Sequence, residues 1–269
     1  MSNINISDIK FSQQKGHIAA ENGPRFFMLP SFKTELCNPG FWRGALGECV
    51  GTMMLTFVLC ATWISWEPIE TDIVKISLSA GFIYTALIYS FGPISGGHLN
   101  PILSFSFLIT RKITVFRGFI YVIAQCTGST CGALLLFACV PHDIRKNLGV
   151  NMMNAALLPK HGFGFESALT FILVFMALST LDAKSEIPGC KSISLGLTYS
   201  ALHFAGLTFS GASFNPARSL GPALVIFYWR NHWIYWVGPF FGSAMASLFY
   251  YVIFDPYNPI NAYRIMNGN

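Results

Sequence analysis

Ser210-Gly211-Ala212-Ser213-Phe214-Asn215-Pro216-Ala217-Arg218 is the stretch of the sequence that decides the fold. Asn is a favoured helix N-cap, and Pro is favoured at the first helical position, where its missing N–H would have no partner. We therefore expect a new helix to begin at Asn215. Because a long apolar run precedes it, this helix begins at membrane depth. A charge such as Arg218 at that depth usually marks a functional site.

The same pattern occurs once earlier in the chain, at residues 95–102, where Asn100 precedes Asn215 by 115 positions. A second echo is a Glu-x-x-x-Thr pattern that begins at Glu48 and again at Glu166, 118 positions later. Interrupted segments at corresponding positions of two halves indicate a membrane protein with internal repeats and a pathway at their interface.

Composition supports a membrane protein. The 269-residue chain is 53% hydrophobic and only 11% charged, whereas about 25% charged is usual for soluble domains. The net charge of +5 is spread along the loops, so we expect no nucleic-acid partner. The seven cysteines show no metal-ligand spacing, and no nucleophile–base constellation is visible. We therefore expect neither a cofactor nor an enzyme.

Apolar runs predict six full spans, at about 42–66, 73–92, 115–139, 162–182, 190–209 and 231–254, each near the ~20 residues that cross a bilayer. Two shorter runs, at about 100–110 and 215–226, reach only about 15 Å, half the membrane. Gly92-Pro93 is expected to end the second span. Each repeat then has three spans and one half-helix, so the second repeat is inverted relative to the first.

The predicted fold class is therefore an all-α integral membrane protein with six transmembrane helices and two re-entrant half-helices. We expect a tail at 1–40, a channel domain at 41–254 with repeats at about 41–139 and 162–254, and a second tail at 255–269. Lys and Arg are more frequent on the side of both termini, so both tails are expected in the cytoplasm. That side carries Lys10, Lys15, Arg25, Lys33, Arg43, Arg111, Lys112, Arg117, Lys184, Lys191 and Arg264, whereas the other carries Lys75, Arg145, Lys146, Lys160 and Arg230.

The two half-helices are expected to meet by their N-termini, where each dipole places about half a positive charge. Asn100 and Asn215 would present amide N–H donors there. Irregular backbone is tolerated at membrane depth only where it lines a cavity or is buried in protein. The loops at about 93–99 and 206–214 should therefore border a channel for a small neutral polar molecule.

Four further polar residues in apolar segments need an interpretation. Arg218 is read as a selectivity group facing the pathway, the alternative being a side chain that reaches the outer interface. His203 is either a packing histidine or a pathway residue. Glu48 and Glu166 are read as hydrogen-bond acceptors for the loop backbone, the alternative being proton carriers.

The two boxes, Asn100-Pro101-Ile102 and Asn215-Pro216-Ala217, together with the repeated Glu-x-x-x-Thr pattern, resemble those of the aquaporins, or major intrinsic proteins, of the animal water-channel type. The resemblance covers about residues 41–254. It implies a homotetramer in the lipid membrane, expected in the plasma membrane, with one water-conducting pore per subunit. It also implies a four-residue aromatic/arginine filter, here Ala80, His203, Ala212 and Arg218. His98 is expected to give structural support, together with Glu48 and Glu166.

Two departures from the family pattern keep alternatives open. Ala80 replaces a Phe, which favours a facilitator for a broader range of small neutral solutes such as glycerol, urea or hydrogen peroxide. Ile102 replaces the Ala of the first box, which, with the long tail, favours a poorly conducting junctional or adhesion protein. The expected function remains passive, single-file water conduction that excludes ions and protons.

Overall fold

The computed structural model describes residues 32–65, 72–145, 147–182 and 190–255, and these residues form helices and connecting loops without a strand. The helices are α2 (Phe32–Leu36), α3 (Pro39–Ala61), α4 (Ile73–Ser95), α5 (Pro101–Ile109), α6 (Val115–Cys139), the 3-10 turn η1 (His142–Ile144), α7 (Pro159–Asp182), α8 (Cys190–Gly206), α9 (Pro216–Ile226) and α10 (Ile234–Ile253). Except for α2 and the start of α3, the predicted N-terminal tail lies outside the described residues, as does the C-terminal tail beyond Asp255.

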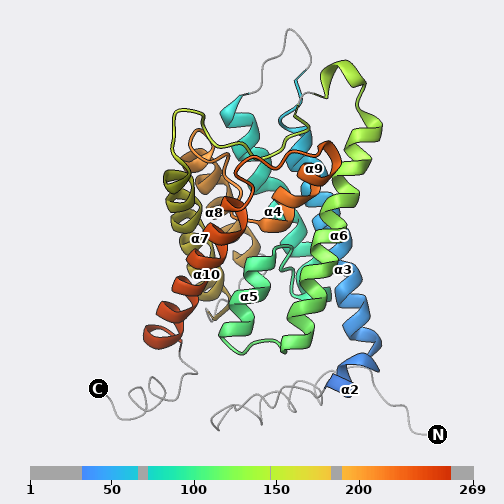
Figure 1. Cartoon of the computed structure of the whole chain (residues 1–269). Coiled ribbons are helices and arrows are strands. Elements are labelled where there is room, and N and C mark those ends of the chain that lie inside the picture. Colours follow the sequence, from blue (N-terminus) through green and yellow to red (C-terminus); the bar gives the residue numbers. More distant parts are fainter. Residues whose placement is uncertain (1–31, 66–71, 146, 183–189, 256–269) are drawn as a thin grey trace, which may run out of the picture.

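Six long helices surround two short ones (Figure 1). Five of them, α3, α4, α6, α7 and α10, are long and apolar enough to cross a membrane. The sixth, α8, has 17 described residues, which is at the lower end of the range for a span. The predicted all-α fold is confirmed, and the helix bounds lie within a few residues of those expected.

The short helices α5 and α9 begin where the two Asn-Pro pairs are. Each is capped by its asparagine: the Asn100 side chain accepts a hydrogen bond from the N–H of Ile102, and that of Asn215 from the N–H of Arg218. Pro101 and Pro216 occupy the first helical positions, where no N–H is needed. In Figure 1, α5 lies in the lower half of the bundle and α9 in the upper half, so each reaches only part of the way through it.

The expected end of the second span at Gly92-Pro93 is wrong. Helix α4 continues through Pro93 to Ser95 and ends at Gly96, which has a left-handed φ of 96° and donates its N–H to the Gly92 carbonyl. A left-handed residue after the last helical turn is a common helix end and favours glycine. Gly96, rather than the proline, therefore turns the chain toward the centre.

The helices pack in pairs that repeat the internal symmetry: α3 packs on α6, and α7 packs on α10. The two repeats also cross, since α4 packs on α8, α9 on α6, and α5 on α10. Gly128 and Gly242 make matching close approaches. A Cβ on Gly128 would lie 2.0 Å from the Cys49 carbonyl oxygen, and one on Gly242 2.1 Å from that of Ser167. Small residues that let helix backbones approach are the usual device for packing in lipid.

The close approach at Gly128 leads to a stability prediction. Gly128→Ala forces α6 away from α3, and overpacking of this kind typically costs about 1–3 kcal/mol. We expect a lower melting temperature for the detergent-solubilised variant. Gly164→Ala is the matched control, because nothing lies within 4 Å of a Cβ there. Equal melting temperatures of the two variants would contradict the close-packing account.

Candidate functional site

The first half-helix loop is held by one buried carboxyl group. Glu48 is fully buried in α3, and its two oxygens accept hydrogen bonds from the backbone N–H groups of His98 (2.9 Å) and Leu99 (2.6 Å). The Ser95 hydroxyl (2.6 Å) and the Gln125 amide (2.7 Å) also donate to it. Together these four bonds use both carboxyl oxygens. The two bonds from His98 and Leu99 satisfy backbone N–H groups of the buried loop.

Glu166 in α7 does the same for the second loop. Its Oε1 accepts from the Ser210 hydroxyl (2.6 Å) and the Ser213 N–H (3.0 Å), and its Oε2 from the Phe214 N–H (2.7 Å). The structure thus shows the loop hydrogen bonds that the sequence analysis expects of both glutamates. Gln125 is a partner of Glu48 that sequence reasoning missed. A lone amide in an apolar span is the signal that could have found it.

The two loops repeat an unusual backbone conformation. Leu99 has a φ of 53° and Phe214, at the corresponding position, 35°. Ala212 also has a positive φ, 50°. Non-glycine residues in this region are strained and persist where their surroundings fix them, often at functional sites. The carboxyl oxygens of Glu48 and Glu166 bind the N–H groups of Leu99 and Phe214, and therefore hold the strained residues directly.

The two asparagines meet at the centre and tie the repeats together. The Asn100 side-chain nitrogen donates to the Phe214 carbonyl (2.9 Å), and the Asn215 side-chain nitrogen donates to the Leu99 carbonyl (3.0 Å). Each amide nitrogen carries two hydrogens, so these reciprocal bonds leave one N–H on each side chain. Two N–H donors and two helix N-termini therefore converge on one place.

Arg218 lies in the first turn of α9 and is only 2% exposed. Its Nη1 donates to the Asn151 Oδ1 (2.9 Å), while its Nε has no hydrogen-bond partner. The side chain is therefore held within the protein and does not extend to the surface. Asn151 also accepts from the Ser219 hydroxyl and donates to the Gly211 carbonyl. Sequence reasoning missed Asn151, because a loop asparagine carries no periodic or motif signal.

The other predicted filter residues are buried as well. Ala80 and Ala212 are fully buried, and both belong to the central cluster of buried side chains. His203 is 3% exposed, and its Nδ1 lies 2.9 Å from the Tyr199 carbonyl oxygen. If that nitrogen carries the hydrogen, Nε2 is left as an acceptor.

A pocket of about 410 Å³ lies next to the segment that contains Asn151. The residues that border it come from the connection between α6 and α7, which includes Val150 and Met152 on either side of Asn151, and from Leu207 and Thr208 at the end of α8. Because Asn151, the partner of Arg218, lies between two of these residues, the pocket adjoins the site, and we call it the entrance pocket.

The remaining predicted site residues belong to the support around the half-helices. The His98 Nδ1 pairs with the Ser104 hydroxyl (2.9 Å), and its ring packs edge-on against Phe107. Ile102 is fully buried, and its carbonyl accepts from Ser243 of α10 (2.9 Å). Ala217 and the two box prolines are also buried.

Comparison with known proteins gives one family. The sequence profile of the major intrinsic proteins matches residues 35–250. The chain is similar to aquaporin-4 of Mus musculus, with 36% identity over 80% of this chain and 68% of that protein. It is also similar to aquaporin-5 of Sus scrofa, with 34% identity over 83% of this chain and 85% of that protein. The fold resembles that of the aquaglyceroporin from Plasmodium falciparum, with a TM-score of 0.74, 22% identity, and coverage of 82% and 99% of the two chains.

The loop support generates a second prediction. In Glu48→Gln an amide group replaces one acceptor oxygen, so a buried N–H of the first loop loses its partner, which typically costs about 1–3 kcal/mol. We expect a lower melting temperature and a smaller folded fraction on size exclusion in detergent. Asp72→Asn is the control, since it makes the same chemical change at an exposed helix cap, where Asn caps equally well. Equal losses in the two variants would contradict a special role for Glu48.

Proposed function

The chain belongs to the major intrinsic protein family, whose members are membrane channels and not enzymes, and from this premise we propose that it conducts water selectively. Water would move in single file down osmotic gradients, while ions and protons are excluded. We further propose that the chain acts as a homotetramer in the plasma membrane. Both termini would lie in the cytoplasm, because Lys and Arg are more frequent in the loops on that side.

The observation that carries the proposal is the reciprocal hydrogen bonding of Asn100 and Asn215. Each amide keeps one N–H for a passing molecule at the point where two positive helix ends meet. A water oxygen can accept a hydrogen bond from each of these two N–H groups in turn. A cation finds only donors and positive dipole ends there, with no carboxylate to replace its hydration shell. The site therefore favours a small neutral acceptor over ions.

Arg218 and His203 support water over larger solutes. A buried guanidinium with a free Nε and a neighbouring imidazole offers polar groups on one side of the entrance. A molecule with an apolar carbon chain has to lose hydration there without gaining apolar contact from these groups. The similarity to aquaporin-4 and aquaporin-5, proteins whose names place them among aquaporins, points the same way.

A second candidate is a facilitator for small neutral solutes, and the methyl group of Ala80 is the observation that favours it. Ala80 leaves the filter level without an aromatic ring on α4. If this position sets the width of the pathway, glycerol should pass. Ala80→Phe would then reduce glycerol flux and leave water flux in place.

Stopped-flow light scattering of proteoliposomes tests the proposal. Under a sucrose gradient we expect shrinkage several-fold faster than that of empty liposomes, and under a glycerol gradient we expect no re-swelling above the empty-liposome rate. Glycerol entry that Ala80→Phe removes would replace the proposal by the second candidate. Water flux at the empty-liposome rate, with the protein folded and incorporated, would exclude both and leave a poorly conducting junctional or adhesion protein.

A further inference from the structure

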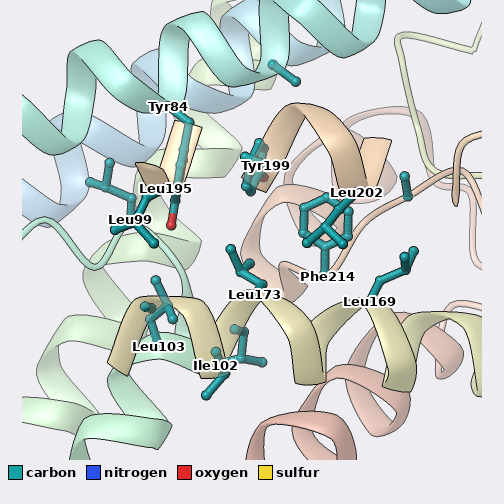
Figure 2. Close-up of a cluster of buried hydrophobic side chains, with 14 of the residues drawn as sticks. Tyr84, Leu99, Ile102, Leu103, Leu169, Leu173, Leu195, Tyr199, Leu202 and Phe214 are labelled. Carbon is teal, nitrogen blue, oxygen red and sulfur yellow. The ribbon is translucent and has the colours of Figure 1, made fainter. Parts of the chain in front are cut away.

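Two tyrosine rings lie face to face in the central cluster. Tyr84 of α4 and Tyr199 of α8 have ring centroids 4.1 Å apart and planes inclined by 12°. Figure 2 shows the pair among Leu99, Leu173 and Phe214, which come from the first loop, α7 and the second loop. Both tyrosines are fully buried. Stacked rings at this separation leave no room for a molecule between them.

The register of the two helices places this pair one turn below the filter. The Ser200 hydroxyl donates to the Ser77 carbonyl, and Gly196 approaches Gly81, so α4 and α8 run antiparallel. Tyr84 follows Ala80 by four residues and Tyr199 precedes His203 by four. Both therefore lie about 6 Å deeper than the filter residue on the same helix face.

The direction is inward. Helix α8 ends at Gly206, and the next residues, Leu207 and Thr208, border the entrance pocket. Tyr199 therefore lies farther from the entrance than His203. Tyr199 and His203 both contact the Phe214 ring edge-on at 4.9 Å, and Tyr199 also interacts with the Asn215 side chain. The tyrosine pair thus lies between the filter and the central asparagines.

The hydroxyl group of Tyr84 is buried and has no hydrogen-bond partner. The hydroxyl group of Tyr199 interacts with the Asn215 side chain. Burying a hydroxyl without a partner costs free energy, so the Tyr84 hydroxyl is open to a transient partner, and Tyr199 connects the pair to the central asparagine.

We propose that Tyr84 and Tyr199 form a second, deeper filter that selects water and replaces the ring absent at Ala80. The inference rests on the proposed water conduction. A water molecule that leaves His203 and Arg218 meets the edges of the two rings and hydrogen-bonds to their hydroxyls before it reaches the asparagine amides. The rings exclude glycerol by their size. The hydroxyls keep the passage polar enough for water to enter without holding it.

The test compares variants in the same proteoliposome assay. Tyr84→Ala should raise water permeability and admit glycerol at a rate about tenfold or more above the native protein, since a missing side chain in a selecting pocket has effects of at least this order. Tyr84→Ile, a milder change, should admit glycerol to a smaller extent and serves if the alanine variant does not fold. Leu136→Ala is the matched control, because this buried leucine lies in a separate cluster, and it should leave both fluxes unchanged.

The double variant Tyr84→Phe/Tyr199→Phe separates size from hydrogen bonding. It keeps both rings, so glycerol should stay excluded, while water flux should fall about two- to fivefold because each hydroxyl contributes one hydrogen bond. A purely structural role would change the melting temperature of the tyrosine variants but would not make glycerol permeability depend on residue 84.

The remaining outcomes are distinguishable. Continued glycerol exclusion and native water flux in the folded Tyr84→Ala and Tyr84→Ile variants would overturn the second filter and leave the water channel intact. Glycerol entry through the native protein would also overturn it. Flux at the empty-liposome rate in the native protein and all variants would overturn the proposed function and, with it, this inference.

Discussion

Non-helical backbone at membrane depth must find hydrogen-bond partners inside the protein, because lipid offers none. The described structure depends on this constraint twice, and Glu48 and Glu166 satisfy it in the same way. Their carboxyl oxygens bind consecutive N–H groups of the two loops and hold Leu99 and Phe214 at positive φ. The loop conformation aims the asparagines and starts the half-helices. A change at either glutamate therefore acts on the centre of the molecule, although neither side chain is needed to contact the permeant.

The centre belongs to both repeats at once. Each asparagine caps its own half-helix with its oxygen and donates its nitrogen to the loop of the other repeat. Tyr121 and Tyr235 add a symmetric pair of contacts, since their hydroxyls donate to the carbonyls of Ser95 and Ser210. Neither repeat can form the convergent donors alone. Internal duplication thus supplies the two opposed half-helices that a site at the bundle centre requires.

Much of this arrangement could be predicted from the sequence, because charge-free runs and Asn-Pro caps are local signals. Helix α6 has the bounds expected of it, and both half-helices begin at the predicted caps. The failure at Pro93 is also local: the missing N–H of a proline is tolerated in the last helical turn when Gly96 ends the helix. Gln125 and Asn151 could not be predicted, because their roles come from distant segments. Tyr84 and Tyr199 read as core residues until the antiparallel register of α4 and α8 is known.

The replacement of a ring at Ala80 by one at Tyr84 changes more than the depth of a constriction. In the proposed pathway, the methyl group of Ala80 would leave a molecule beside Arg218 and His203 room for part of its hydration shell. The proposed tyrosine filter would lie one helical turn deeper, next to the positive ends of α5 and α9. If the two tyrosines form the size filter that we propose, selection by size moves away from Arg218 and His203, and the size barrier then acts close to the charge barrier at the asparagines. In that arrangement, a cation that loses its hydration water at the rings would meet the positive helix ends at once, where the loss of hydration is most costly.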